Sequence, residues 1–81
     1  MKIIVYSTDA CPWCYKVKQY LKEKGVAFTE YNVGEDRKKA EEMVEKSGQM
    51  SVPVTDIDGE IILGFNKEAI DGALKKSKLK N

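Results

Sequence analysis

The residues of this sequence best suited to chemistry are two cysteines, Cys11 and Cys14, with Pro12 and Trp13 between them. Residues 2–7 before them are apolar and β-branched and predict a buried strand, whereas Pro12 suits the first turn of a helix. Cys11 is therefore expected at a helix N-terminus, where unpaired backbone N–H groups and the helix dipole favour a thiolate. We expect Cys11 to attack a disulfide and Cys14, one turn further on, to displace the product thiol.

Two other uses of this cysteine pair are compatible with the spacing. A structural disulfide between Cys11 and Cys14 closes so short a loop that it contributes only about 2 kcal/mol before ring strain is subtracted. A structural zinc site needs four ligands, and because the chain has no histidine, a second chain would have to complete it. We favour redox chemistry and keep metal binding as an alternative.

The side chains near the cysteines can each be explained either by the structure alone or by a function. Trp13 can be a partly packed surface aromatic residue or a wall for the substrate next to the reactive sulfur. Lys16 and Lys18 can add positive potential near Cys11, but we expect them to point outward from the helix and to be solvated. Tyr6 and Tyr15 receive no function, because a tyrosine with one apolar side at a sheet edge needs none.

The remaining chain predicts alternating strands and helices around the cysteine pair. The first helix carries Cys14, Val17 and Leu21 on one face and stops at Gly25. The expected elements after it are a strand at 26–33, a helix at 35–47, two strands at 54–57 and 60–63 joined by Asp58-Gly59, and a helix at 67–77. The order β-α-β-α-β-β-α predicts an α/β fold with a parallel crossover and an antiparallel hairpin.

Apolar spacing and caps locate the last two helices. In the helix at 35–47 the inward stripe consists of Ala40, Met43 and Val44, and Gly48 is placed to end this helix in a left-handed conformation. Asn66 can cap the last helix. The inward residues of that helix are Ala69, Ile70, Ala73 and Leu74.

Size and charge limit the kind of molecule. A chain of 81 residues forms one domain, spanning 1–81. Its 14 basic and 13 acidic residues nearly cancel, which argues against nucleic acid or an anionic membrane as a partner, and we interpret the basic run 75–80 as a solvated helix end. Because no apolar stretch suits a membrane span or a signal peptide, we expect a cytoplasmic protein, and a monomer.

The Cys-Pro-Trp-Cys motif, followed later by Ser51-Val52-Pro53, resembles the pattern of the dithiol glutaredoxins over nearly the whole chain. The resemblance implies a thioredoxin-like fold with a four-stranded mixed sheet and three helices. It also implies a cis bond between Val52 and Pro53, which presents a backbone edge beside the active thiol. The substrate contacts implied by the resemblance are Pro12, Trp13, Val52, Pro53, Gly64, Phe65 and Asn66.

The same resemblance implies a thiol–disulfide oxidoreductase that reduces mixed disulfides of proteins or of glutathione. It needs no bound cofactor, and its reductant is glutathione, recycled by glutathione reductase. Glutaredoxins usually carry a Gly-Gly pair and acidic residues after the hairpin, where this chain has Gly64, Phe65 and Asn66. Here Gly64 still allows a close backbone approach and Asn66 can cap the helix at an anion site.

Two alternatives follow from these departures and from the family. With a phenylalanine after that glycine, the chain resembles the redoxins that donate electrons to ribonucleotide reductase. Those redoxins look like glutaredoxins but are reduced by thioredoxin reductase. Some glutaredoxin relatives instead carry a metal or an iron–sulfur cluster on the first cysteine at a dimer interface, with glutathione as the other ligand. In this chain Cys11 would be that ligand.

Overall fold

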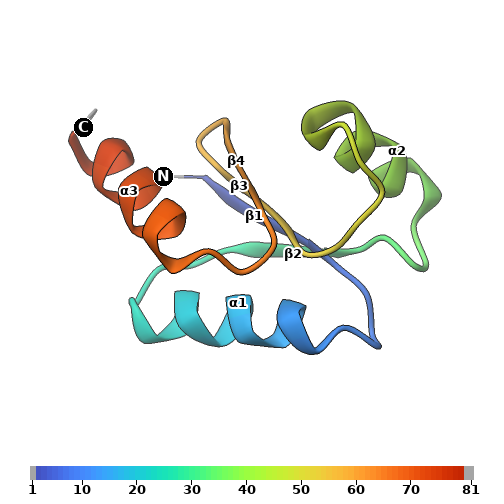
Figure 1. Cartoon of the computed structure of the whole chain (residues 1–81), viewed down its shortest axis with the longest axis horizontal. Coiled ribbons are helices and arrows are strands. Elements are labelled where there is room, and N and C mark those ends of the chain that lie inside the picture. Colours follow the sequence, from blue (N-terminus) through green and yellow to red (C-terminus); the bar gives the residue numbers. More distant parts are fainter. Residues whose placement is uncertain (1, 80–81) are drawn as a thin grey trace.

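The computed structural model describes residues 2–79, and it contains the predicted elements in the predicted order (Figure 1). The strands are β1 (Ile3–Ser7), β2 (Thr29–Asn32), β3 (Val54–Ile57) and β4 (Glu60–Leu63), and the helices are α1 (Pro12–Glu23), α2 (Arg37–Ser47) and α3 (Lys67–Leu79). Lys80, in the run predicted to be a solvated helix end, lies outside the described residues. Between residues 2 and 79 no helix is long and apolar enough to cross a bilayer.

The four strands form one mixed sheet in the order β2-β1-β3-β4. β1 pairs with β2 in parallel, as a strand–helix–strand crossover requires, and with β3 in antiparallel orientation. β3 and β4 form the antiparallel hairpin that Asp58-Gly59 predicts. The predicted α/β, thioredoxin-like architecture is therefore confirmed.

The helices cover opposite faces of the sheet because the side chains of β1 alternate between two cores. Val5 faces α1 and α3, where it packs with Val17, Leu21 and Ile70 in the larger cluster. Its neighbours Ile4 and Tyr6 face α2 and pack with Met43 and Val54 in a smaller cluster. In Figure 1, α1 and α3 lie together on one side of the strands, and α2 lies apart from them.

The helix ends follow the capping signals of the sequence. Cys11 is the N-cap of α1, with Pro12 as its first helical residue. Gly48 ends α2 at φ 77° in the left-handed region, where glycine has no Cβ to clash. The Oδ1 atom of Asn66 accepts a hydrogen bond from the Ala69 N–H at 3.1 Å and so caps α3.

Three predicted boundaries differ from the structure by two residues or more. β2 begins at Thr29 and not at Val26, because pairing with β1 starts where Ile4 meets Thr29; Val26 and Phe28 instead pack against the larger core. The helix predicted from residue 35 begins two residues later, since Asp36 acts as its N-cap. The last helix extends beyond residue 77 to Leu79.

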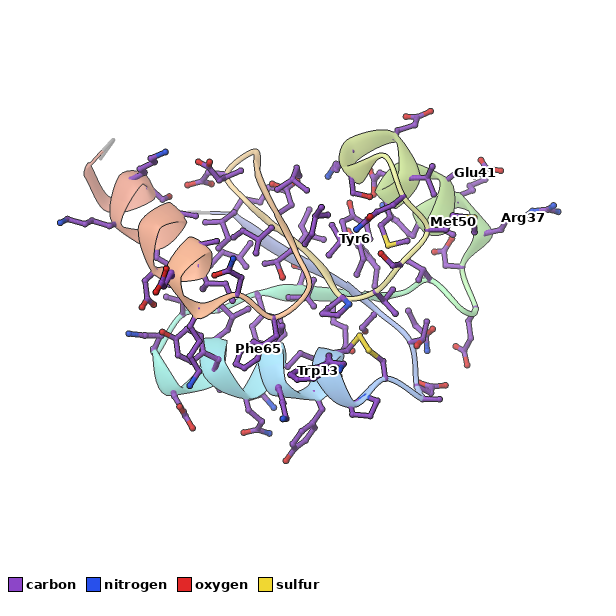
Figure 2. The ribbon with its side chains drawn as sticks, viewed as in Figure 1. Tyr6, Trp13, Arg37, Glu41, Met50 and Phe65 are labelled. Atoms are coloured by element: carbon purple, nitrogen blue, oxygen red, sulfur yellow. A yellow bond between two sulfur atoms is a disulfide. The ribbon has the colours of Figure 1, made fainter. Side chains whose placement is uncertain are left out.

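The predicted inward stripe of α2 is only partly inward. Met43 is buried, but Ala40 and Val44 are half-buried and border an open hollow next to Met50. Met50 is 78% exposed, and Figure 2 shows it beside α2 together with Arg37 and Glu41. The smaller core therefore takes only one buried residue from a helix, Met43 of α2. The larger core includes buried residues of both α1 and α3.

Tyr6 does not lie at a sheet edge, as the sequence suggested, but on the interior strand β1 with its side chain buried. Its hydroxyl donates to Glu42 at 2.8 Å and accepts from the Lys46 Nζ at 2.9 Å, and Lys46 also donates to Asp56 at 2.8 Å. Burial raises the pKa of the Tyr6 hydroxyl, so the group stays neutral and retains its proton for Glu42. We call Tyr6, Glu42, Lys46 and Asp56 the Tyr6 network.

Candidate functional site

The two cysteines occupy unequal positions at the start of α1. They are joined by a disulfide, with their Cα atoms 5.2 Å apart. Cys14 is 1% exposed, whereas Cys11 is only partly buried. Of the two sulfur-bearing residues, Cys11 is thus the one that a second molecule can reach.

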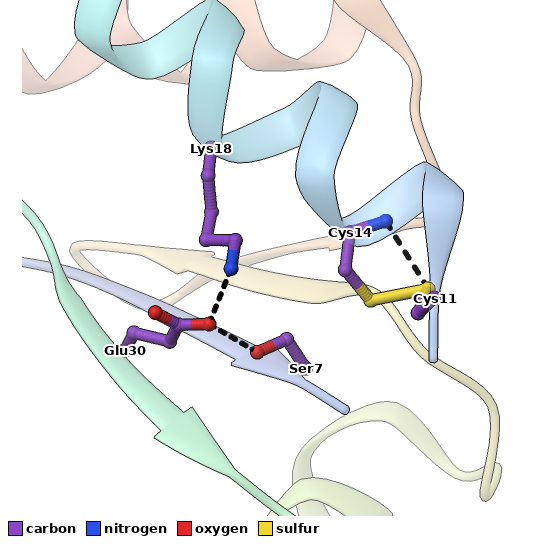
Figure 3. Close-up of a disulfide and its surroundings, with 5 residues drawn as sticks. All are labelled: Ser7, Cys11, Cys14, Lys18 and Glu30. Carbon is purple, nitrogen blue, oxygen red and sulfur yellow. Dashed lines mark hydrogen bonds and ion pairs between the residues drawn. A yellow bond between two sulfur atoms is a disulfide. The ribbon is translucent and has the colours of Figure 1, made fainter. Parts of the chain in front are cut away.

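The backbone of α1 directs a donor at the Cys11 sulfur. The Cys14 N–H donates to the Cys11 Sγ at 3.1 Å (Figure 3). This N–H belongs to the first turn, where no preceding carbonyl is available as a helical partner, and the sulfur takes that role. The same donor favours negative charge on the Cys11 sulfur when the disulfide is open.

A small pocket lies beside the start of α1. It has a volume of about 280 Å³ and is lined by Trp13, Val52, Pro53, Gly64 and Phe65; we call it the cis-proline pocket. The bond between Val52 and Pro53 is cis, as the resemblance implied. The Gly64 N–H donates to the Pro53 carbonyl at 2.9 Å and ties the end of β4 to this bond.

Aromatic rings make up the wall of this pocket nearest to α1. Trp13 is 55% exposed, and its ring centroid lies 6.3 Å from that of Phe65. Phe65 in turn meets Tyr20 edge to face at 6.0 Å, a favourable geometry for aromatic pairs. Figure 2 shows Trp13 and Phe65 close together on the side of the molecule that carries the disulfide. Trp13 is therefore both a packed aromatic residue and an open wall beside the cysteines.

Five of the seven substrate-contact residues predicted from the sequence line the cis-proline pocket, and two do not. Pro12 is exposed at the first position of α1 and serves the helix start. Asn66 follows Phe65 directly, but its side chain caps α3. Among residues 2–79 no group of three or more cysteine or acidic side chains is arranged to hold a metal ion.

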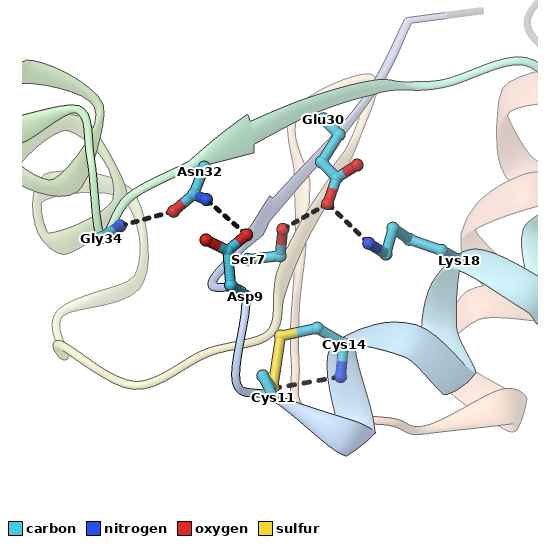
Figure 4. Close-up of polar contacts among 8 residues, drawn as sticks. All are labelled: Ser7, Asp9, Cys11, Cys14, Lys18, Glu30, Asn32 and Gly34. Atoms are coloured by element: carbon cyan, nitrogen blue, oxygen red, sulfur yellow. Dashed lines mark hydrogen bonds and ion pairs between the residues drawn. A yellow bond between two sulfur atoms is a disulfide. The ribbon is translucent and has the colours of Figure 1, made fainter.

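The prediction that Lys18 points into solvent is wrong. Its Nζ forms an ion pair with Glu30 Oε2 at 2.6 Å, and the buried Ser7 hydroxyl donates to the same oxygen at 2.6 Å. Figures 3 and 4 show these groups on the side of α1 to which Cys14 points. The signal was present in the sequence, because Lys18 follows Cys14 by four positions and shares its helix face.

The Lys18 hydrogen bond, followed by the Ser7 hydrogen bond, lowers the pKa of the Glu30 carboxyl. Glu30 therefore keeps its charge to a lower pH than an ordinary glutamate, and it anchors α1 to β2 and the end of β1. Lys16, in contrast, is exposed as predicted, with its Nζ 4.4 Å from the centroid of the Trp13 ring. The two lysines of the same helix turn thus have different surroundings.

A second polar contact fixes the loop that leads into Cys11. The Asn32 side-chain amide donates to Asp9 Oδ1 at 2.9 Å, and its oxygen accepts from the Gly34 N–H at 2.9 Å (Figure 4). A side chain built at Gly34 would meet Asn32 at 3.2 Å and the Thr8 side chain at 3.7 Å. The loop between β1 and Cys11 is therefore fixed by a side chain of β2, Asn32.

Comparison with known proteins agrees with this fold and cysteine motif. A family model described as glutaredoxin matches residues 3–62. An uncharacterized glutaredoxin-like 8.6 kDa protein in the rubredoxin operon of Clostridium pasteurianum is 53% identical over 74 residues, covering 91% of this chain and 99% of that protein. Glutaredoxin 3 of Escherichia coli is 38% identical over 60 residues, covering 74% of this chain and 72% of that protein.

A solved structure adds a relative with a different activity profile. The glutaredoxin-like protein NrdH-redoxin from Escherichia coli, described as having a thioredoxin-like activity profile, superimposes with a TM-score of 0.80 at 25% identity. The match covers 89% of this chain and 93% of that protein. This chain is thus similar in fold both to glutaredoxins and to a redoxin with thioredoxin-like behaviour.

Proposed function

Since this chain belongs to the glutaredoxin family, whose members are thiol–disulfide oxidoreductases, we propose that it reduces mixed disulfides of proteins or of glutathione through Cys11 and Cys14. The observation that carries this proposal is the asymmetry of the two cysteines. Cys11 is accessible and receives an N–H at 3.1 Å, whereas Cys14 is buried one turn further on. Such an arrangement suits a nucleophile and a resolving thiol.

The first step of the proposed reaction is an exchange at Cys11. The Cys11 thiolate attacks one sulfur of the substrate disulfide and forms a new bond to it, and the other substrate sulfur leaves as a thiolate that takes a proton from water. The Cys14 N–H supports the thiolate before the attack. Trp13 and Pro53, which line the cis-proline pocket next to the start of α1, would hold the attacked substrate in place.

The second step is intramolecular. Cys14 loses its proton to solvent and attacks the Cys11 sulfur, which re-forms the disulfide between them and releases the remaining substrate thiolate. The substrate gains two electrons and the cysteine pair loses two. An external thiol or dithiol must then return these electrons to the pair.

Glutathione is the electron donor we propose, in keeping with the similarity to glutaredoxin 3. A second candidate is thioredoxin reductase. It is favoured by Phe65, which stands where glutaredoxins usually carry a second glycine, and by the likeness to NrdH-redoxin. Either donor system belongs to the reducing cytoplasm, where we propose that the protein works as a monomer.

The test is NADPH consumption during reduction of the mixed disulfide between 2-mercaptoethanol and glutathione, with glutathione plus glutathione reductase as the donor system. We expect rapid turnover by the wild type, none above background for Cys11→Ser and, in a separate incubation with the disulfide substrate but without glutathione, accumulation of trapped mixed disulfides by Cys14→Ser. A parallel assay replaces the donor system by thioredoxin reductase and distinguishes the two candidates. Turnover by Cys11→Ser equal to that of the wild type would refute the proposal.

A further inference from the structure

Next to the cis-proline pocket lies a second hollow, between α1 and the start of α3. Its volume is about 170 Å³. Its lining residues are Tyr15, Lys16, Gln19, Tyr20, Glu23, Phe65 and Lys67. Because Phe65 lines both hollows, they adjoin along one surface that leads away from the cysteines; we call this surface the Phe65 trough.

The two parts of the trough differ in chemistry. Near the cysteines the wall consists of the rings of Trp13 and Phe65 and the side chains of Val52 and Pro53. Such a lining suits an apolar side chain, and a volume of about 280 Å³ has room for one. Beyond Phe65, Lys16 and Lys67 bring two positive charges, and the acidic lining residue is Glu23.

These two lysines are held by aromatic rings. The Lys16 Nζ lies 4.4 Å from the centroid of Trp13, and the Lys67 Nζ lies 5.6 Å from that of Tyr20 and 5.7 Å from that of Phe65. Over the described part of the chain neither lysine forms an ion pair with a carboxylate, whereas Lys18 does. A cation over a ring is positioned but not neutralised.

We propose that the Phe65 trough binds an extended segment of a protein disulfide substrate that has an apolar residue next to its cysteine and acidic residues beyond it. The apolar side chain enters the cis-proline pocket, and the carboxylates meet Lys16 and Lys67. This inference rests on the proposed reductase function and specifies its substrate class. It makes the charge beyond Phe65, rather than the cysteines, the source of selectivity among protein substrates.

The expected selectivity is moderate because both lysines are exposed. An exposed ion pair improves binding by about two- to fivefold. Two such pairs would favour an acidic segment over an uncharged one by roughly five- to twentyfold in kcat/KM. Salt should reduce this preference, since at about 1 M the screening length is only about 3 Å.

The experiment uses three peptides that differ only in charge, with the sequences Cys-Leu-Glu-Glu, Cys-Leu-Gln-Gln and Cys-Leu-Lys-Lys, each as a mixed disulfide with 2-mercaptoethanol. The kcat/KM values are measured with the wild type, with Lys16→Glu/Lys67→Glu and with the milder Lys16→Gln/Lys67→Gln. The control is Lys38→Glu/Lys75→Glu, which changes the net charge equally at exposed lysines outside the trough. Circular dichroism verifies folding of every variant.

We expect the wild type to prefer the acidic peptide, the Gln variant to lose the preference, and the Glu variant to prefer the lysine peptide, while the control keeps the wild-type order. Equal kcat/KM for all three peptides with the wild type would overturn the inference. So would a reversal by the control, because net charge alone would then be responsible. If no peptide and no small mixed disulfide is reduced, the proposed function fails, whereas a missing preference with active enzyme refutes only the trough.

Discussion

The two faces of the sheet are stabilised in different ways. On the face of α1 and α3 a large apolar cluster includes Val5 and Ile70, and Cys14 is buried in α1 together with two members of this cluster, Val17 and Leu21. On the face of α2 the apolar cluster is smaller, and the Tyr6 network spans from helix to strand beside it. The difference indicates that the face bearing the site is stabilised mainly by its larger apolar cluster, with the Lys18–Glu30–Ser7 contact beside it, whereas the other face combines a smaller apolar cluster with the Tyr6 network.

Two buried hydroxyl groups, one on each face of the sheet, differ in their hydrogen bonding. Tyr6 and Thr55 are both fully buried on neighbouring strands, and alternation places them on opposite faces. The Tyr6 hydroxyl has two hydrogen-bond partners. The Thr55 hydroxyl has none among residues 2–79. Removing each hydroxyl should therefore change stability with opposite sign.

The largest expected difference between the faces is the cost of truncating a core side chain. Leu21→Ala should lower the free energy of unfolding by about 4 kcal/mol, and Met43→Ala by about 2 kcal/mol. Both side chains are buried, but Leu21 packs within the larger cluster, whereas Met43 neighbours the half-buried Ala40 and Val44, which can close over the cavity. Urea unfolding of both variants at neutral pH measures the two costs. Equal costs would contradict the proposed difference between the cores.

The next effect concerns the Tyr6 network. Tyr6→Phe removes the hydroxyl that joins Glu42 and Lys46 and should destabilise the fold by about 1 to 2 kcal/mol. Tyr15→Phe at an exposed tyrosine is the matched control, and its effect should stay within about 0.5 kcal/mol. Thermal and urea unfolding measure both. If the two variants lose the same stability, the network contributes nothing specific to the α2 face.

Thr55→Val tests the opposite sign. It replaces a buried hydroxyl without a partner by a methyl group of similar shape, and we expect a gain of about 1 kcal/mol in the free energy of unfolding. The reductase activity should persist, since Thr55 lies on β3 within the sheet and lines neither hollow of the trough. A loss of stability would mean that the hydroxyl is hydrogen-bonded in solution, for example to a buried water.

The smallest effect is a pH dependence on the site-bearing face. The folded-state pKa of Glu30 lies below its ordinary value because of Lys18 and then Ser7. Its contribution to stability is therefore present above the ordinary pKa and is lost as the pH falls through the folded value. Glu30→Gln should cost at most about 1 kcal/mol at neutral pH, because the Glu30 side chain is 41% exposed. The difference from wild type should shrink below about pH 4.

Unfolding curves at neutral pH and at acidic pH, for the wild type and Glu30→Gln, check this expectation. Glu60→Gln supplies a matched control, because its ion pair with Lys76 is longer, at 3.8 Å, and more exposed. A gap between wild type and Glu30→Gln that stays constant across the acidic range would show that the carboxylate charge is not responsible.

Local signals explain how much of the fold the sequence predicts. Gly48, Asn66 and the Asp58-Gly59 turn act on their own neighbouring backbone, so their roles could be inferred without the tertiary structure. Features that depend on a distant partner were missed. The start of β2 depends on where β1 begins, and the ion-pair partner of Lys18 is Glu30, which lies on another element, although the spacing from Cys14 already indicated the helix face of Lys18.

The candidate site also has a part that local sequence predicts and a part that depends on distant segments. Cys11 and Cys14 are neighbours in sequence, and their unequal burial follows from a helix start alone. The cis-proline pocket joins α1, the start of β3 and the end of β4. The spacing of apolar residues does not indicate that these distant segments come together. Only the resemblance to the glutaredoxin family predicted that they form one site. Lys67 was not singled out from the sequence, because its position over the Tyr20 ring of α1 depends on how α3 docks.

The closeness of Cys14 to Cys11 sets the lifetime of the mixed disulfide in the proposed reaction. The first exchange, at Cys11, is bimolecular, so its rate follows substrate concentration. The second exchange joins two sulfurs of one chain whose Cα atoms are 5.2 Å apart, and its rate is fixed by the fold, as for any well-oriented intramolecular reaction. A covalent complex with a substrate therefore has the same lifetime whether that substrate is scarce or abundant, and it ends without the arrival of a further molecule.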